Sequence, residues 1–391
     1  MLKGYFKNYV FVFFCIINLA HALPQKPKVA DFENTIHGTV DFQEPVLKEL
    51  CASPVMQRLK HIHQYGTYFI SHPFSGGRTF TRYSHSLGVL KMLQLAKEKG
   101  AEISPAQMVA ALLHDCSHTA FSHSTDVLFM GGYTKGAYQD KIHERFLRKY
   151  GILDIVKKYG FSLADILPDH PQHTALEQPT PNICADRLEY NLHSGYLTGL
   201  LTDQDRQAIL ADIRFENNQW YFTDPALAAK LARISLYNAL HTWGSPASLL
   251  TGMHASKALK ILVDQKIITL EDIKYNKNDD EIWKIMAESP IPEVRQAVNA
   301  ILHIDDTFKI VNEGEHDMIV KGKFSGIDPF VLVNGHMMRL TACDPLYREE
   351  FLRTKEVVHR GRPIKFLRLR SSEQPPIEVS FERLYKQGYV C

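Results

Sequence analysis

The amino-acid sequence predicts a mainly α-helical protein with a small β hairpin, followed by a smaller antiparallel β region at the C-terminal end. Across residues 31–305 the apolar residues recur at helical spacing, in segments separated by Gly, Pro and polar residues. From Thr307 onward they recur at every second residue, and Asn334-Gly335 fits a two-residue hairpin turn. We therefore expect a helical domain over residues 31–305 and a β-rich region over residues 306–391.

The composition is that of an ordinary globular protein and argues against two classes of partner. Of the 391 residues, 45% are hydrophobic and 23% are charged, so extended disorder is not expected. A net charge of +2 and a pI near 8.1 are too balanced to indicate a nucleic-acid groove or a membrane-binding face. The five Lys and Arg residues of Arg360–Arg370 fit a solvated strand face better than a binding patch. Partners must therefore be inferred from a site, and a homo-oligomer stays open.

The N-terminal residues follow the order of a secretory signal peptide. Lys3 and Lys7 flank a short basic region, an apolar run of eleven residues follows, and Ala20-His21-Ala22 provides the small residues that precede a cleavage site. The run is short for a bilayer span, although an uncleaved N-terminal anchor is the alternative. We expect residues 1–22 to be removed, which would give an exported protein without a stable membrane span. The remaining cysteines are few and odd in number, so no disulfide framework is predicted.

Three predicted helices lead to one segment that is rich in His and Asp. A helix that begins at Pro54 is followed, after a loop rich in Gly, Ser and Pro, by a helix over Ser86–Lys99. Ser104-Pro105 has the N-cap residue and first-turn proline of the third helix, and the apolar residues of that helix end at His114-Asp115. The polar groups therefore lie at the exposed end of a rigid element.

The segment after this helix gathers groups that bind metals and transfer protons. His114 and Asp115 are followed within a few residues by His118, His123 and Asp126. Imidazole and carboxylate together suit divalent metals that prefer nitrogen and oxygen ligands. Taken alone, a His-Asp pair is more often a satisfied core histidine beside a capping aspartate, because short motifs have many false positives. The cysteine inside the cluster is more simply a small buried hydrophobe.

Two adjacent residues on a helix cannot enclose a metal, because their side chains diverge by about a hundred degrees around the axis. His114 and Asp115 would need a histidine and a carboxylate from neighbouring helices. His85 precedes the second helix, and Asp186 lies in a further helix predicted over Asn182–Leu192. Two His and two Asp leave room for water or substrate, which favours Mn, Fe or Mg over a closed tetrahedral Zn site.

The rest of the helical domain is predicted with fewer functional signals. Ile213–Phe222 has the alternation of a small hairpin, with Asn217-Asn218 at the turn. Further helices are predicted over Tyr138–Tyr150, Pro225–Leu262 and Asp280–Ile301. The first of these includes the pair His143-Glu144.

Five separated motifs occur in one order along the chain: R-Y-S-H ending at His85, H-D-x-x-H over residues 114–118, F-S-H-x-x-D ending at Asp126, the pair His143-Glu144, and Asp186 within a helix. Over residues 54–301 this set resembles the HD superfamily of metal-dependent phosphohydrolases. It is most similar to deoxynucleoside triphosphate triphosphohydrolases of the SAM-and-HD-domain type, without the SAM domain. The resemblance implies an HD-type helical domain, a divalent metal cofactor and a small phosphorylated substrate, with a nucleotide expected and no nucleic-acid partner.

The resemblance also implies roles for individual residues. The residues that match the metal ligands are His85, His114, Asp115 and Asp186. The residues that match the catalytic groups are His118, His123, Asp126, His143 and Glu144. The residues that match contacts to the substrate are Gln64, Arg82, Arg187 and Tyr190. We expect His123 to act as the general acid, with Asp126 holding its other ring nitrogen.

Two departures from the family pattern affect the substrate more than the chemistry. Trp243 stands where the family has an arginine, and Ser194 replaces an acid expected near the sugar hydroxyl. Losing a phosphate-binding arginine and a sugar-reading carboxylate leaves the metal chemistry in place but removes groups that select a deoxynucleoside triphosphate.

Two other classes of function are alternatives to an exported phosphohydrolase. A catalytically silent metal- or nucleotide-binding regulatory protein on an HD fold could lose His118, His123 and Glu144, yet all three are present. A structural metal site in a helical adaptor would be expected to close its coordination shell with protein ligands and would not need the additional histidines. The sequence therefore favours the enzyme.

Overall fold

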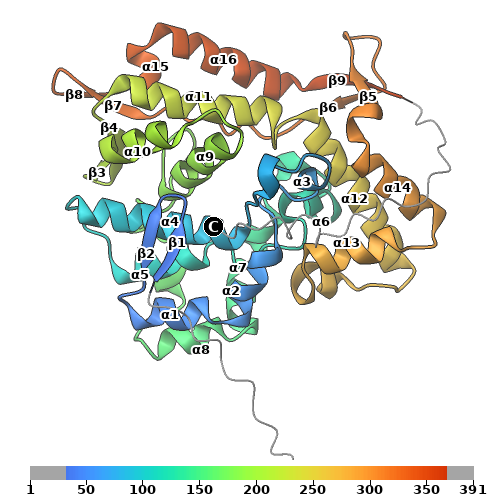
Figure 1. The fold of residues 1–391 in the computed structure, drawn as a ribbon, viewed down its shortest axis with the longest axis horizontal. Coiled ribbons are helices and arrows are strands. Elements are labelled where there is room, and N and C mark those ends of the chain that lie inside the picture. Colours follow the sequence, from blue (N-terminus) through green and yellow to red (C-terminus); the bar gives the residue numbers. More distant parts are fainter. Residues whose placement is uncertain (1–31, 368–391) are drawn as a thin grey trace, which may run out of the picture.

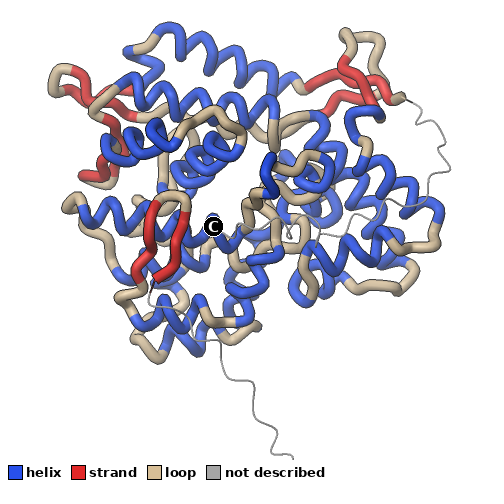
Figure 2. The backbone as a smooth tube through the Cα atoms, in the orientation of Figure 1, coloured by secondary structure: helices blue, strands red, loops and turns tan. Residues whose placement is uncertain are grey.

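The structure, a computed structural model, describes residues 32–367 and consists mainly of helices (Figure 1). One strand hairpin lies over the helices, and the other strands lie at two edges of the helical body (Figure 2). The helices of the first half are α1 (Pro45–Cys51), α2 (Pro54–Arg58), α3 (Tyr68–Ser71), α4 (Arg82–Glu98), α5 (Pro105–Leu113), α6 (Asp126–Met130), α7 (Tyr138–Lys149) and α8 (Ile152–Lys157). Those of the second half are α9 (Ala185–Leu197), α10 (Asp203–Asp212), α11 (Pro225–His241), α12 (Pro246–Asp264), α13 (Asp279–Ala287), α14 (Pro292–Leu302), α15 (Leu340–Cys343) and α16 (Pro345–Arg360).

Short helical turns connect these elements. They are η1 (Leu59–His61), η2 (Ser75–Gly77), η3 (Ser122–Thr125), η4 (Tyr133–Lys135), η5 (Ala164–Ile166), η6 (Asp272–Asn276) and η7 (Ile304–Asp306). η3 and η4 lie on either side of α6, in the segment that follows the His-rich end of α5.

The strands form three small sheets. The hairpin β1 (Phe32–Thr35) and β2 (Gly38–Asp41) lies over α4. The second sheet has the order β3-β4-β7-β8, from β3 (Arg214–Glu216), β4 (Gln219–Phe222), β7 (Phe330–Val333) and β8 (His336–Arg339), and β4 and β7 run parallel. The third sheet is antiparallel with the order β5-β9-β6, from β5 (Phe308–Ile310), β9 (Arg362–Phe366) and β6 (Met318–Val320).

The predicted fold class is confirmed, with a mainly helical body, a small hairpin and C-terminal antiparallel strands. The C-terminal strands belong to two sheets, because β7 and β8 pair with the β3–β4 hairpin of the helical part while β5, β6 and β9 form their own sheet. The C-terminal region also contains α16, which packs along α11 at one edge of the molecule (Figure 1). Part of the predicted C-terminal strands, residues 377–381, lies outside the described residues.

The helix that begins near His85 starts earlier than predicted. α4 begins at Arg82, because Thr81 and Ser84 form a reciprocal capping box in which each side chain accepts from the other residue's backbone N–H. His85 therefore lies in the first turn of α4, on rigid backbone, and does not lie in the preceding loop. The predicted start of α5 is confirmed, since the hydroxyl of Ser104 accepts from the N–H of Gln107.

The two predicted hairpin turns are also confirmed. Asn217 and Asn218 have positive φ values of 50° and 62°, and Asn334 and Gly335 have 52° and 78°. Two consecutive positive φ values are those of a type I′ turn, whose twist matches that of the flanking strands.

α4 lies at the centre of the helical core and packs against both α5 and α9. Its apolar residues, with those of α5, are almost completely buried. Cys51, Cys116 and Cys184 are free and buried, so within residues 32–367 they behave as small core residues and form no disulfide.

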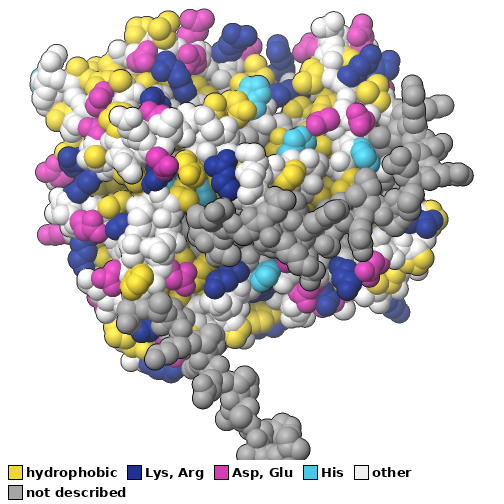
Figure 3. Space-filling model, in the orientation of Figure 1, with side chains coloured by type: hydrophobic (Ala, Val, Ile, Leu, Met, Phe, Trp, Pro, Cys, Tyr) yellow, Lys and Arg dark blue, Asp and Glu magenta, His cyan; other side chains and the backbone are white. Residues whose placement is uncertain are grey.

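The surface agrees with the balanced charge of the sequence. On the face drawn in Figure 3, basic and acidic side chains are interspersed. Over residues 32–367 the structure has no helix that is both long and apolar enough to span a bilayer. The predicted signal peptide, residues 1–22, lies outside the described residues.

Candidate metal centre

The predicted metal ligands come from three helix ends that meet beside the core. His85 lies in the first turn of α4, His114 is the C-cap of α5 with Asp115 directly after it, and Asp186 lies in the first turn of α9. The packing of α4 against α5 and α9 brings these ends together. All four side chains are buried except for Asp186, whose carboxylate is 21% exposed.

The four side chains converge on one point. Nε2 of His85 lies 2.9 Å from Oδ1 of Asp186, 3.1 Å from Nε2 of His114 and 3.6 Å from Oδ2 of Asp115. Nε2 of His114 lies 3.6 Å from Oδ1 of Asp115. One ligand atom each from His85, His114 and Asp186 lies within 4.8 Å of the other two.

The tautomers of the two histidines are those of metal ligands. Nδ1 of His114 lies 2.7 Å from the carbonyl oxygen of Ala111, which can only accept, so this nitrogen has the proton. Nδ1 of His85 contacts the carboxylate of Glu189 in the same way. Each ring therefore presents the lone pair of its Nε2 to the centre, which is the arrangement that outer carboxylates and carbonyls impose on metal-bound histidine.

The charge of the site also fits a divalent cation. Burial alone would lower the pKa of His85, but Glu189 and Asp186 outweigh it and raise that pKa to about 10. Burial likewise opposes ionisation of Asp115, yet the adjacent guanidinium of Arg82 holds the pKa of this carboxyl well below its usual range. Without a cation, a proton shared between His85 and these carboxylates offsets part of their charge. A divalent cation held by His85, His114, Asp115 and Asp186 would displace that proton from Nε2 and compensate the carboxylates in its place.

The predicted catalytic histidines lie next to this centre. Nε2 of His118 lies 3.3 Å from Oδ1 of Asp115, and its ring meets that of His123 edge to face at 4.9 Å. Nδ1 of His123 lies 2.9 Å from Oδ2 of Asp126, and the other oxygen of Asp126 accepts from the N–H of Tyr138. His123 is 52% exposed, whereas burial lowers the pKa of His118 to about 3 and keeps it neutral.

The pair His143-Glu144 is split by the geometry of α7. His143 is buried, its Nδ1 lies 2.8 Å from the hydroxyl of Ser117, and its Nε2 has no partner among the described residues. Glu144 is 57% exposed and pairs with Arg148 one turn further along. Adjacent helix residues point about a hundred degrees apart. The structure therefore brings His143 towards the site and does not bring Glu144 there.

The four predicted substrate contacts differ in where their side chains lie. Nη1 of Arg82 donates to Asp115 at 2.6 Å, so this arginine is oriented by a metal ligand. Arg187 donates to the carbonyl oxygens of Gln178 and Asn182 and therefore anchors the loop before α9. The remaining two are Gln64, whose buried Oε1 has no partner among the described residues, and Tyr190, whose ring lies 6.4 Å from that of His85.

Comparison with known proteins identifies the family. No protein-family model matches the chain. The metal-dependent phosphohydrolase cns2 of Cordyceps militaris is 30% identical over 276 residues, which cover 68% of this chain and 75% of that protein. The chain belongs to the HD-type metal-dependent phosphohydrolases.

Other similar proteins match over different lengths. YdhJ of Bacillus subtilis, an uncharacterized protein, is 28% identical over 83% of this chain and 95% of its own length. The deoxynucleoside triphosphate triphosphohydrolase SAMHD1 of Danio rerio is 29% identical over 30% of this chain and 19% of that protein. The crystal structure of a phosphohydrolase from Bacteroides thetaiotaomicron has the same fold, with a TM-score of 0.65 and 16% identity over 87% of this chain and all of that one.

In this HD phosphohydrolase, further residues surround the ligand His85 from outside the metal centre, and the sequence analysis missed them. The carboxylate of Glu189, one turn after Asp186, contacts Nδ1 of His85 and also lies 3.1 Å from His37 and 2.9 Å from His193. Gly88 of α4 makes room for it, because an added Cβ there would lie 2.6 Å from Cγ of Glu189. The i, i+3 spacing of Asp186 and Glu189, which puts two acids on one helix face, was the available signal.

The two departures from the family pattern lie on one side of the centre. Trp243 packs edge to face on Tyr190 at 5.3 Å, and Tyr190 in turn lies beside His85. The hydroxyl of Ser194 lies 2.6 Å from that of Tyr65 and donates to Asn238. Aromatic rings and neutral hydroxyls therefore occupy the positions where the family pattern has charged groups.

Loss of a single metal ligand should empty the centre. We predict that His85→Ala or Asp115→Ala abolishes tight metal binding and lowers the Tm, because ligands from separate helices tie the domain together. Glu189→Gln should weaken metal binding by about 10- to 100-fold, the usual effect of losing an outer-shell partner. Glu144→Gln, on the exposed face of α7, is the matched control. Elemental analysis and equilibrium dialysis measure the result, and unchanged metal content in His85→Ala would contradict the ligand assignment.

Proposed function

We propose that this chain hydrolyses a phosphate ester or anhydride of a nucleotide with the help of a divalent metal. The observation that supports the proposal best is the position of the His123–Asp126 pair, directly beside the ring of His118 and hence beside Asp115. A protein that only retained a metal would not need a half-exposed histidine oriented by a buried carboxylate next to the metal centre.

Each residue has a distinct part in the proposed reaction. When bound, the metal would neutralise charge that develops on the phosphoryl group and orient or activate water. His123 protonates the leaving oxygen through its Nε2, because Asp126 occupies Nδ1 and fixes the direction of the ring. His118, neutral and buried, lies between Asp115 and the ring of His123 and holds that ring in place, and Arg82 balances the charge of Asp115.

A nucleotide substrate is supported by two features of the site. Tyr65, Tyr190 and Trp243 form an aromatic wall next to His85, and aromatic rings suit the flat face of a base. SAMHD1, a relative over part of the chain, is a deoxynucleoside triphosphate triphosphohydrolase. Assay of the purified chain against nucleoside mono-, di- and triphosphates with Mn, Mg or Fe tests the proposal, and no hydrolysis of any of them would refute it.

Export remains part of the proposed function. The basic flank, apolar run and small-residue pattern of residues 1–22 support removal of a signal peptide, which would leave Leu23 at the mature N-terminus. Intact-mass measurement on protein from the native host distinguishes the two forms. A full-length mass would contradict cleavage.

His123→Ala should separate catalysis from metal binding. The variant should keep its metal, because His123 is not among the proposed ligands, and should lose roughly 10²- to 10⁴-fold in kcat if proton transfer is its main contribution. Asp126→Asn should show the same pattern with a smaller loss, since the ring would remain but lose its orienting charge. Near-native kcat in His123→Ala would remove the acid assignment.

Trp243→Arg should change substrate binding and leave the metal unchanged. The substitution restores the charge that the family pattern has at this position, next to Tyr190 and the metal centre. We expect a lower KM for nucleoside triphosphates, because a guanidinium forms charge-assisted hydrogen bonds with phosphate. Trp243→Gln removes the ring without adding charge and is the control. An unchanged KM for every triphosphate would show that the natural substrate has no phosphate at this position.

A further inference from the structure

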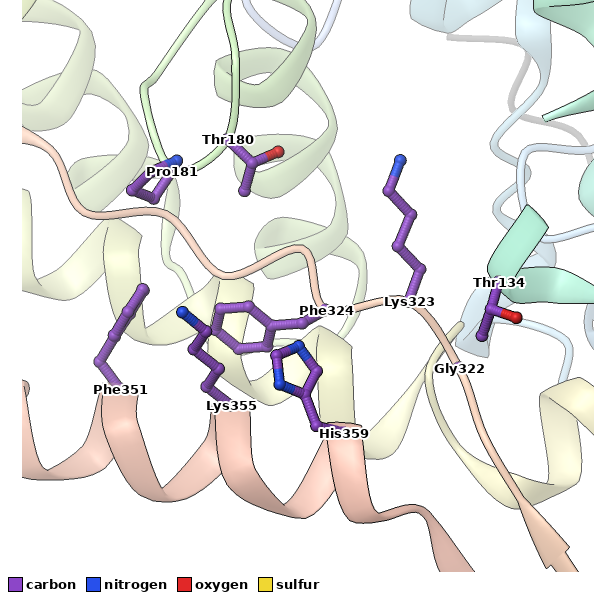
Figure 4. A pocket seen from close by; sticks show the side chains of 9 residues that line it. All are labelled: Thr134, Thr180, Pro181, Gly322, Lys323, Phe324, Phe351, Lys355 and His359. Carbon is purple, nitrogen blue, oxygen red and sulfur yellow. The ribbon is translucent and has the colours of Figure 1, made fainter. Parts of the chain in front are cut away.

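A cavity of about 410 Å³ lies between α16 and the Thr180-Pro181 loop, and none of its lining residues belongs to the metal centre (Figure 4). Its basic side chains do not converge, because Lys323 points away from Lys355 and His359 (Figure 4). The polar groups that do converge surround the turn over residues 119–122, which joins the two proposed catalytic histidines. The residues that hold this turn lie far from it in the sequence.

The backbone of the turn has an uncommon conformation. Phe121 and Ser122 have positive φ values of 61° and 50°, a region that residues with side chains rarely adopt. Two such residues in succession persist only where the surrounding structure fixes them. Both are almost completely buried, and a Cβ added to Gly66 would lie 2.3 Å from the carbonyl oxygen of Phe121. Close packing therefore leaves the turn little room to relax.

The segment 273–279, which contains the end of η6 and the start of α13, binds the middle of the turn. The N–H of Ala120 donates to the carbonyl oxygen of Ile273 at 2.9 Å, and the N–H of Phe121 donates to Oδ1 of Asp279 at 2.6 Å. η6 is a π-helix, a form that is rare and often lies at functional sites. Both N–H groups at the middle of the turn thus have acceptors on this one segment.

Asp279 uses both of its carboxylate oxygens. Its Oδ2 accepts from the N–H of His63 at 2.8 Å, and the hydroxyl of Ser122 donates to the carbonyl oxygen of His63 at 2.6 Å. Asp280 and Glu281 also lie in the first turn of α13, where acids favour the start of a helix. Asp279 differs from them because it is completely buried and faces the turn. It therefore joins the turn to the His63 segment.

Arg58 connects the same segment to the start of the turn. Its Nη1 donates to the carbonyl oxygen of His118 at 2.8 Å, and its Nε and Nη2 donate to that of Lys277 at 3.1 and 3.0 Å. Burial raises the pKa of Asp279 to about 7, against the two N–H donors and the charge of Arg58, while the charge of Asp280 adds to the rise. At pH 8 the carboxyl of Asp279 is thus ionised and both oxygens accept.

We propose that Asp279, together with Arg58, positions the turn so that the rings of His118 and His123 lie side by side at the metal centre. These rings meet edge to face at 4.9 Å, and the turn is the backbone that connects them. Asp279 is a positioning residue, because it bonds the backbone of the turn and of His63. Its effect on turnover rests on the proposed function, whereas its effect on the two rings does not.

Asp279→Asn, measured at pH 8 in the metal-loaded chain, tests the proposal. An amide has one acceptor oxygen, so the N–H of either Phe121 or His63 loses its acceptor. We expect kcat to fall about 10- to 100-fold, as for a small misplacement of a catalytic group, with KM and metal content unchanged. Asp280→Asn removes a charge from the same helical turn, and its kcat should stay within about twofold of that of the unaltered chain. Equal kcat in the two variants would overturn the proposal.

A spectroscopic measurement tests the same point without a substrate. In the magnesium-loaded chain with labelled histidine, the rings of His118 and His123 should give a nuclear Overhauser contact that is lost in Asp279→Asn and kept in Asp280→Asn. A retained contact in Asp279→Asn would overturn the proposal. If the unaltered chain hydrolyses no nucleotide, the proposed function fails, and this contact still decides the role of Asp279.

Arg58→Lys covers the case in which Asp279→Asn does not fold. A single ammonium cannot replace the fork of a guanidinium that bonds His118 and Lys277 together. We expect a lower kcat at unchanged KM and metal content, with a smaller fall than in Asp279→Asn, and a weakened contact between the two rings. An unfolded Asp279→Asn chain together with an unchanged kcat and ring contact in Arg58→Lys would leave Asp279 a role in folding alone and would overturn the proposal.

Discussion

The buried contact between the carboxylates of α9 and the first turns of α4 is the interaction on which the site depends. Asp186 and Glu189 meet His85 from opposite sides of its ring, and Gly88 lets the two helices approach closely enough for this. Burying charge in a core is costly unless it is compensated. The pairing of Arg82 with Asp115 and the histidines around Glu189 compensate charge at this junction, and the capping box of α4 fixes the backbone that holds His85.

The residues that converge in the candidate metal centre could be found from the sequence because they lie at recognisable helix ends or in ordered motifs. His114-Asp115 follows the apolar face of α5, and Asp186 lies in the first turn of a helix. Glu189 had a local signal in its spacing from Asp186, but its contact with His37 had none, because these two residues are 152 positions apart and meet only when the β1–β2 hairpin packs over α4. The position of Glu144 could not be predicted for a local reason. The motif gives the pair His143-Glu144, but it does not say which side of α7 faces the site.

The C-terminal region shows which structural features the sequence pattern can predict and which it cannot. Alternation correctly indicated its strands, and the Asn334-Gly335 turn was predictable from the backbone preference of its two residues. The sheet that each strand joins was not predictable. β7 pairs in parallel with β4, which lies more than a hundred residues earlier, and no local pattern encodes such a contact. The start of α16 did have a local signal: Asp344-Pro345 has the same cap and first-turn proline as Ser104-Pro105, and its side chain caps the N–H of Tyr347.

The sharing of a sheet between β4 and β7 has a consequence for selectivity. The proposed metal centre and acid do not by themselves select a substrate, and at Trp243 and Ser194 this chain lacks the arginine and the sugar-reading carboxylate of the family pattern. Selectivity must then come from elsewhere in the fold. The C-terminal region is joined to the helical domain through the sheet, through α16 on α11 and through the hydrogen bond from Asp328 to Pro181. A region fixed in this way can hold its side chains at a constant distance from the metal centre, whereas a loosely tethered one could not.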